Sequence, residues 1–509
     1  MFWSTGRGTD TARGFAAAAL AVALVACHPH VRPNPAVATA SPTATLRHDI
    51  DEILAEPTLA HGIWGVLVKS LKNDDTLYDL NARKLFVPAS NMKIVTLAAA
   101  AERLGWDYTY ETRLLAAGRV DAGRLDGDLV VAGSGDPSIG YLDGSADRLF
   151  DDWAAKLKAA GIQTVSGRLI GDDNAFDDEE LGFGWSWDDL PDDYAAGVSA
   201  LQFNENAVRL TIAPGPSVGA SAGISLSPSG SGLLVDSTVT TSARDAAPTI
   251  AAHRLPGSVR LELRGTVPLG STPQTRAVSV DNPTLFFVGA LRTALISRGI
   301  DVRGPSVDVD DVADRPSQAA AAPIATHRSA PLSQLALRLM KDSQNLYAET
   351  FLKTVGLVVG TPTYAAGRTQ VQLALGPWGI GAGDLIQRDG SGLSRYDFVT
   401  PAALVTILTH VARDERLHGP FEASLPIGGR DGSLANRLKG TAAEGNVRAK
   451  TGSMTSVRSL SGYVTTAAGE PLVFSIIANN FDTPPATINA ATDAIVVRLA
   501  SPLTLRDLR

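Results

Sequence analysis

Cysteine is nearly absent from this chain, because Cys27 is the single cysteine among 509 residues. A lone cysteine has no partner within the chain, so no internal disulfide stabilises the fold. Histidine is also sparse, and the eight histidines form no HxxxH motif and no metal-ligand spacing with cysteine. The sequence therefore predicts no protein-bound metal and no cofactor.

Basic residues are fewer than acidic ones: the chain has 45 lysines and arginines and 53 aspartates and glutamates, so its net charge is -8. No clustered basic surface is recognisable, which argues against nucleic acid as a partner. Long apolar runs are missing beyond the N-terminus, so no membrane-spanning helix is expected there. With 44% hydrophobic and 19% charged residues, the chain is typical of a globular protein, and its length indicates about three domains.

The N-terminus is typical of a secretory signal peptide. Arg7 and Arg13 precede an apolar run over residues 15–26, which at about a dozen residues is too short to span a bilayer. Leu24-Val25-Ala26-Cys27 resembles a bacterial lipobox, in which the cysteine is lipidated and becomes the mature N-terminus. In the alternative, a signal peptide is cleaved near Ala38-Thr39-Ala40. Both interpretations predict export to the periplasm or cell envelope, and the first adds a lipid anchor to the membrane.

Three short motifs stand in order along the chain: Ser90-Asn91-Met92-Lys93, Ser343-Gln344-Asn345 and Lys450-Thr451-Gly452. Ten of the 45 basic residues are lysines, and no lysine other than Lys93 has a serine three positions before it. Likewise, no asparagine other than Asn345 has a serine two positions before it. Each motif is weak alone, but the combination indicates a serine nucleophile assisted by amines.

The first motif predicts a nucleophile and its base. Ser90 follows Pro88 at the start of a predicted helix that ends at Gly105, so Ser90 and Lys93 project from the same helical face. The helix N-terminus directs free backbone N–H groups toward a developing oxyanion. Lys93 can accept the serine proton only as a free amine, so either burial or a neighbouring cation must lower its pKa. Lys450, if it lies nearby, would be such a cation.

The other two motifs complete the predicted site. Ser343-Gln344-Asn345 lies in a break between two helical runs, with Ser343 as a proton relay and Asn345 as a ligand of the substrate amide. On a strand, alternation places Lys450 and Gly452 on one face and Thr451 and Ser453 on the other. We expect the glycine to let a substrate backbone approach this strand. Taken singly, these motifs are also compatible with a helix cap and a solvent-facing edge strand.

The pattern of elements predicts an α/β (α+β) fold in which a central antiparallel sheet is covered by helices. The first strands of the chain could join the last ones. Between them lie roughly 220 residues of different texture, partly rich in glycine, serine and proline, which favour one or two inserted domains. The expected strands are 62–70, 76–80, 446–453, 457–465 and 471–479, and the expected helices include 92–105, 485–499 and one that Thr400 and Pro401 begin.

On these residues the chain resembles a known family. The order and spacing of the motifs are similar to those of penicillin-binding D-alanyl-D-alanine carboxypeptidases/endopeptidases of the S13 type, over most of residues 46–509. Ser343 lies 253 residues after Ser90, whereas class A β-lactamases carry these motifs much closer together, and inserted domains would produce the gap. The most specific further string is DGSGLSR, from Asp389 to Arg395.

The resemblance implies a serine transpeptidase/β-lactamase-like domain that carries one or two inserted β-rich domains. We expect a signal peptide with a lipobox over residues 1–27 and a flexible tether over 28–45. The expected domains are a catalytic domain of 46–105 and 325–509, an inserted domain II of 106–170 and 266–324, and an inserted domain III of 171–265.

The resemblance also implies catalytic roles. Ser90 is expected to be the acylated nucleophile and Lys93 its base, and backbone N–H groups of Ser90 and Ser453 are expected to form the oxyanion hole. Two departures from the family pattern, Gln344 inside its motif and Ser453 where threonine is frequent, keep the reacting groups. The expected catalytic residues are Ser90, Lys93, Ser343, Asn345 and Lys450.

A substrate site is expected around them. Lys450 and Thr451 would bind the terminal carboxylate, and Arg395 would be available to the carboxylate of a diamino-acid side chain in the stem peptide. The expected substrate-binding residues are Thr451, Gly452, Ser453, Arg395, Met454, Thr455, Trp187, Asp189 and Tyr194.

The function that the resemblance implies is an exported serine DD-peptidase acting on peptidoglycan stem peptides. It would remove terminal D-Ala, cleave D-Ala–diamino acid crosslinks, or do both, and β-lactam antibiotics would inhibit it. One alternative is a β-lactamase, which needs a positioned base and water for fast deacylation. Another is a wall-binding lipoprotein that keeps the fold without catalysis.

Overall fold

The computed structural model describes residues 42–140 and 143–501. Cys27, the signal peptide and residues 28–41 of the predicted tether therefore lie outside the described residues. None of the helices within the two described ranges combines the length and apolarity that a bilayer crossing requires.

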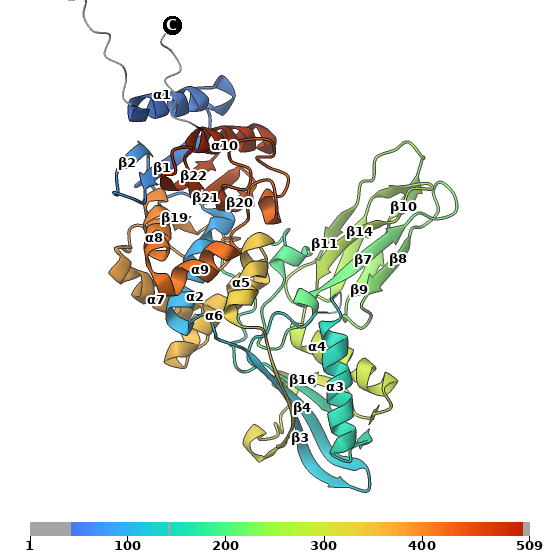
Figure 1. The fold of residues 1–509 in the computed structure, drawn as a ribbon. Helices are drawn as coiled ribbons and strands as arrows, with labels where there is room; N and C mark the ends of the chain where they lie inside the picture. The colour runs from blue at the N-terminus through green and yellow to red at the C-terminus, as the bar shows by residue number, and fades with distance from the viewer. Residues whose placement is uncertain (1–41, 141–142, 502–509) are drawn as a thin grey trace, which may run out of the picture. The chain divides into compact units, whose positions relative to one another are not determined.

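A five-stranded antiparallel sheet carries the first and last strands of the chain (Figure 1). In spatial order it consists of β2 (Thr76–Leu80), β1 (Ile63–Ser70), β22 (Pro471–Asn479), β21 (Val457–Thr465) and β20 (Arg448–Met454). β1 pairs with β22 along its whole length, so the predicted joining of the chain's two ends is confirmed. β20, which carries Lys450, is an edge strand of this sheet. An edge strand at this motif was one of the expectations from the sequence.

Helices cover both faces of this sheet. They are α1 (Pro42–Leu54), α2 (Met92–Leu104), α5 (Leu332–Lys341), α6 (Asn345–Gly356), α7 (Tyr364–Leu375), α8 (Pro401–Arg413), α9 (Glu415–Ser424) and α10 (Pro485–Ala500). Phe474 and Ile476 face a core that includes α1 and α10. Val473 and Ile477 face a second core that includes α2, α5, α6 and α8. Because strand side chains alternate, an apolar strand such as β22 is buried on both faces.

The region between α2 and α5 contains a second, seven-stranded sheet. Strand β3 (Glu111–Asp121) pairs with β4 (Arg124–Gly133), which continues to β5 (Thr164–Val165) and β6 (Leu169–Asp172). The sheet is completed by β15 (Asp301–Val302), β16 (Ser306–Asp308) and β17 (Ala322–Arg328). Two helices accompany it, α3 (Ser145–Ala159) and α4 (Pro283–Ser297).

A group of short strands forms the β-rich part of the inserted region. Its strands pair in the orders β14-β7-β8, β11-β12-β9 and β10-β13. The bounds are β7 (Ala207–Ala213), β8 (Gly223–Ser227), β9 (Leu234–Ser237), β10 (Thr240–Ser242), β11 (Ala251–His253), β12 (Arg260–Arg264), β13 (Thr266–Pro268) and β14 (Gln274–Ser279).

The strand pairing differs from the expected boundaries in detail. Residues 42–45 are helical and not a tether, because α1 begins at Pro42 and buries Leu46 and Ile50. Residues 266–279 belong with the β-rich part, since β14 pairs with β7 and β13 with β10. Residues 325–328 extend the seven-stranded sheet through β17. Local composition does not reveal these boundaries because the pairing partners are distant in sequence.

The cap of α8 gives a test of the local sequence interpretation. The Thr400 hydroxyl accepts a hydrogen bond from the backbone N–H of Ala403 at 3.0 Å, and Thr400 is fully buried. Thr400→Ala should lower the free energy of unfolding by about 1 kcal/mol, because the N–H then lacks a partner. Thr400→Ser keeps the hydroxyl and should lose less. Urea unfolding followed by circular dichroism measures both, and equal losses would show that the cap is not the cause.

Candidate active site

Ser90 lies in a short 3-10 turn, Ala89–Asn91, that leads directly into α2. Two hydrogen bonds fasten this turn to β21. The Ser459 hydroxyl donates to the carbonyl oxygen of Pro88 at 2.7 Å, and the Asn91 amide donates to the Ser461 hydroxyl at 2.7 Å. The predicted placement of Ser90 at a helix start is confirmed, and the sheet holds that start in place.

Gly452 lies against other parts of the protein, a contact that the sequence did not predict. A Cβ at this position would lie 2.1 Å from the Ser459 hydroxyl oxygen, 2.7 Å from the Pro88 carbonyl oxygen and 3.2 Å from the backbone nitrogen of Ser90. This glycine thus permits a close approach between β20 and the turn of the nucleophile, and the approach of a substrate backbone stays a prediction. The spacing between Ser90 and the strand of Lys450 depends on the missing side chain.

The amine of Lys93 is fully buried and has three oxygen neighbours. Its Nζ lies 2.9 Å from the Ser90 hydroxyl oxygen, 2.6 Å from Oδ1 of Asn345 and 3.0 Å from the Ser391 carbonyl oxygen. The two carbonyl oxygens can only accept, so a free amine uses both of its N–H groups on them. Its lone pair then faces the Ser90 hydroxyl, which is the geometry of a base that removes the serine proton.

Burial lowers the pKa of Lys93 to about 7, although the carboxylates of Glu349, Asp389 and Asp397 act in the opposite direction. Of the two expected causes, burial is therefore the one that lowers this pKa, and Lys450 is not among its causes. Burial also lowers the pKa of Lys450, and the charge of Lys93 adds to that effect. Burial thus favours the free amine of Lys93.

Lys450 connects the second and third motifs. Its fully buried Nζ donates to the Ser343 hydroxyl at 2.8 Å and to the carbonyl oxygen of Thr451 at 2.9 Å. The Thr451 hydroxyl donates to the hydroxyl of Ser433 at 2.6 Å. Sequence reasoning missed Ser433, which lies in a glycine-flanked turn with no motif signal of its own. The motifs, more than 100 residues apart, converge on one set of contacts.

A cavity of about 400 Å³ opens over Ser90. Its walls bring together residues from all three motifs, from the loop after Asp389 and from the inserted region. Lys93, Lys450 and Gly452 lie behind the walls, where they are buried. The predicted residues that line the cavity are Ser90, Ser343, Asn345, Thr451, Ser453, Met454, Thr455, Arg395, Asp189 and Tyr194.

Of the three residues expected from the inserted region, Tyr194 and Asp189 line the cavity and Trp187 does not. The carbonyl oxygen of Tyr194 accepts from Nδ2 of Asn345 at 2.7 Å, and the Tyr194 hydroxyl donates to Asp189 at 2.8 Å. An amide has a second N–H, which Asn345 can offer to a substrate. Trp187 does not line the cavity, and it is 59% exposed. Its expected part in the pocket is therefore not supported by its position.

The DGSGLSR string forms a turn between β18 (Leu385–Ile386) and β19 (Phe398–Val399). Asp389 is fully buried and accepts from the backbone N–H groups of Gly392 and Ser394 at 2.7 and 2.6 Å. This turn presents the Ser391 carbonyl to Lys93. The string was recognised in the sequence, but this backbone contact has no side-chain signature and was missed.

Two further contacts hold the DGSGLSR turn against the nucleophile. The buried Glu349 of α6 accepts from the backbone N–H groups of Gly390 and Ser391 at 2.7 and 2.8 Å. Gly392 has a φ of 83°, and a Cβ there would lie 1.9 Å from the carbonyl oxygen of Ala89. A side chain at position 392 would push the turn away from the segment that carries Ser90.

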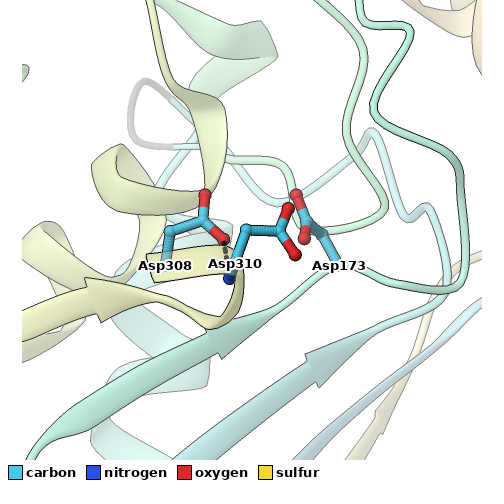
Figure 2. Close-up of side chains that lie close together, drawn as sticks. All are labelled: Asp173, Asp308 and Asp310. Atoms are coloured by element: carbon cyan, nitrogen blue, oxygen red, sulfur yellow. Dashed lines mark hydrogen bonds between the residues drawn. The ribbon is translucent and has the colours of Figure 1, made fainter. Parts of the chain in front are cut away.

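Three carboxylates gather away from this cavity, in the inserted region. Figure 2 shows Asp310 between Asp308 and Asp173, with ligand oxygens within 4.8 Å of one another. Asp173 accepts from the Thr284 hydroxyl at 2.6 Å, and Asp308 from the Asn282 amide at 2.8 Å. Burial raises the pKa of Asp173 to about 6. Asp173 and Asp308 thus have hydrogen-bond donors within the protein. The carboxylate cluster alone does not define a metal site.

The geometry, a serine beside the amine of a buried lysine, fits one class of protein, the serine acyl-transfer enzymes. The chain matches the D-Ala-D-Ala carboxypeptidase 3 (S13) family over residues 46–501. It belongs to that family and is a serine-type D-Ala-D-Ala carboxypeptidase. The resemblance drawn from the motifs is confirmed.

Similar proteins agree with this membership. The D-alanyl-D-alanine carboxypeptidase of Actinomadura sp. is 36% identical over 481 residues, which cover 92% of this chain and 87% of that protein. Penicillin binding protein 4 (dacB) of Haemophilus influenzae matches with a TM-score of 0.78 at 28% identity, over 89% of this chain and 98% of that one. Its structure in complex with a β-lactam matches with a TM-score of 0.72 at 26% identity, over 89% and 99%. The expected fold class is confirmed.

The lowered pKa of Lys93 predicts a pH dependence. With the free amine of Lys93 as the expected base, the rate of Ser90 acylation should rise with pH through about 7 and then level off. Stopped-flow acylation by a chromogenic cephalosporin measures this. Lys93→Ala should be slow at every pH, and Lys158→Ala, which changes an exposed lysine, should keep the wild-type profile. A wild-type rate that does not vary between pH 5 and 9 would contradict the role of Lys93.

Proposed function

We propose that this protein is an exported serine DD-peptidase of peptidoglycan stem peptides that works through a Ser90 acyl-enzyme. Ser90 attacks the carbonyl carbon of the penultimate D-Ala, the terminal D-Ala leaves, and water releases the shortened peptide. The same attack at a D-Ala–diamino acid crosslink makes the protein an endopeptidase. β-Lactams acylate the same serine and inhibit the enzyme, and the β-lactam complex of the Haemophilus influenzae relative supports this.

The observation that carries the proposal is the environment of Lys93. Two carbonyl oxygens take both N–H groups of its free amine, and the remaining lone pair faces Ser90 at 2.9 Å. During attack the serine proton passes to Lys93. The Ser343 hydroxyl passes its proton to the leaving amine and takes a proton in return from Nζ of Lys450, 2.8 Å away. Backbone N–H groups of Ser90 and Ser453 stabilise the oxyanion.

The substrate lies across the cavity between two charged regions. Thr451 and Ser433, both in the cavity wall, bind the terminal carboxylate through their hydroxyls, and the amine of Lys450 lies buried behind that wall. Arg395 and Asp189, both in the cavity wall, bind the carboxylate and the ammonium group at the end of a diamino-acid side chain. Met454 and Thr455 contact the stem of that side chain.

The cavity wall favours a peptidase over a β-lactamase. Among the described residues, Asp189 is the only carboxylate that lines the cavity, and it already accepts from Tyr194. Glu349 is fully buried and bound to two backbone N–H groups. Glu349 is therefore not available to activate a deacylating water, and Asp189 is assigned to the ammonium group of the substrate, so we expect a long-lived β-lactam adduct. Ser90, Lys93, Asn345, Ser343 and Lys450 are all present and hydrogen-bonded within one site. This also disfavours the alternative of a wall-binding lipoprotein without catalysis.

The cell envelope is the proposed location. The relatives include a penicillin-binding protein, which fits an enzyme that meets peptidoglycan outside the cytoplasm. The finer proposal is that residues 1–27 direct export and that Cys27 carries a lipid anchor, and it rests on the lipobox-like sequence alone.

Fluorescent penicillin should label the wild-type protein and should not label Ser90→Ala, because the label is an ester of the Ser90 hydroxyl. Gel fluorescence and mass analysis of the labelled peptide measure this. Ser217→Ala, which changes an exposed serine, serves as the control and should label normally. Folded wild-type protein that stays unlabelled would overturn the proposed function. Rapid loss of the label would indicate a β-lactamase.

Arg395→Met should weaken binding of stem peptides whose third residue is a diamino acid with a free carboxylate. A hydrogen-bonded ion pair contributes about 1.5–3 kcal/mol, so KM should rise about tenfold or more. Peptides with lysine at that position lack the carboxylate, and their KM should change little. Release of D-Ala from the two peptides measures both values. Equal effects on the two would mean that Arg395 does not bind that group.

A further inference from the structure

Ser343 is held in a conformation that its own sequence does not favour. Its φ of 61° is left-handed, a region in which serine is uncommon. In that conformation its hydroxyl meets Lys450 at 2.8 Å. The neighbouring side chains turn elsewhere, Asp342 to Arg338 and Gln344 to the inserted region. An unfavourable conformation persists only where surrounding contacts determine it.

The residues on both sides of Ser343 are linked by hydrogen bonds to one carboxylate, that of Glu205. Nε and Nη2 of Arg338 donate to its two oxygens at 2.7 and 2.8 Å, and Nη1 of the same guanidinium donates to Asp342 at 2.8 Å. The Gln344 amide donates to Oε2 of Glu205 at 2.7 Å. Glu205 therefore acts on the residue before Ser343 and on the residue after it.

Gln344 also fixes the start of α6. Its Oε1 accepts from the backbone N–H of Leu346 at 3.1 Å while its Nε2 donates to Glu205. The amide thus bridges the carboxylate and the helix that begins with Asn345, a partner of Lys93. This bridge explains how glutamine serves at a position where the chain departs from the family pattern.

Glu205 is itself held rigidly within the inserted region. The three residues Asn204–Asn206 have φ values of 53°, 54° and 54°. The amide of the fully buried Asn206 donates to the carbonyl oxygen of Gly197 at 2.8 Å and to Oε1 of Gln202 at 3.1 Å. A turn fixed by such contacts presents its carboxylate in one position.

We propose that Glu205 is a positioning residue of the active site, whose carboxylate holds Ser343 against Lys450 through Gln344 and Arg338. This inference rests on the proposed function, in which Ser343 passes its proton to the leaving amine. Glu205 lines no wall of the catalytic cavity, so it acts on geometry alone. The inserted region then contributes to the chemical step as well as to substrate binding.

The exposure of the Glu205–Arg338 ion pair helps to distinguish a positioning role of Glu205 from a purely structural role. The side chain of Glu205 is 25% exposed and that of Arg338 is 45% exposed. Ion pairs that keep contact with water contribute modestly to stability, and the bidentate geometry of this pair places it at the upper end of that range, which is still a small part of the stability of a chain of this size. Removing the charge should therefore leave the thermal unfolding midpoint nearly unchanged, whereas a shift of Ser343 should slow the chemical step.

The test is Glu205→Gln in the full chain, assayed by release of D-Ala from a synthetic peptide ending in D-Ala-D-Ala. Glutamine offers one acceptor oxygen where glutamate offers two, so Arg338 and Gln344 compete for it. We expect kcat to fall about tenfold or more, with KM and the thermal midpoint nearly unchanged. The double variant Glu205→Gln, Gln344→Glu restores a carboxylate–amide pair beside Arg338 and should recover most of kcat.

Glu262→Gln is the matched control, because it removes an ion pair, to Arg264 at 2.9 Å, within the same inserted region. It should leave kcat and KM unchanged. Wild-type kcat in Glu205→Gln would overturn the proposal. So would a loss of kcat that follows an equal loss of thermal stability, or a double variant that recovers nothing. A wild-type protein that releases no D-Ala would instead refute the proposed function.

Discussion

The burial of the Lys93 amine is the constraint on which the rest of the site depends. A charged ammonium group without water is costly, so burial favours the free amine and makes a base of a side chain that is otherwise protonated. That burial requires three segments to meet, since the partners of the amine come from the turn before α2, the start of α6 and the DGSGLSR turn. Catalytic competence is thus a property of their packing.

Two glycines make this packing possible. Position 392 faces the carbonyl of Ala89 and position 452 faces Pro88 and Ser90, and a Cβ at either would collide with backbone. The nucleophile turn is therefore enclosed between the DGSGLSR turn and β20. The sheet adds the remaining support, because β21 binds the same turn through Ser459 and Ser461. Strands from the C-terminal end of the chain hold a helix from its N-terminal end.

Much of the catalytic region could be predicted because its signals are local. Thr400 caps α8 through its own hydroxyl, and the strands near residues 448–479 follow from apolar runs bounded by turns. The inserted region was less predictable. Its strands are short and pair over long sequence distances, as β14 does with β7. Trp187 was expected in the pocket on the family resemblance, together with Asp189 and Tyr194, but neighbouring residues in an irregular segment need not share a direction.

The sequence by itself predicted the candidate reacting groups and their order, because Ser90 and Lys93 lie one helical turn apart and the other motifs are short strings with few chance matches. Only the tertiary structure decided how these groups work. The lowered pKa of Lys93 comes from burial, the contact of Ser343 with Lys450 spans 107 residues, and the role of Gly452 depends on what lies opposite it. Such properties arise between segments distant in sequence, where local patterns carry no information about distance or solvent.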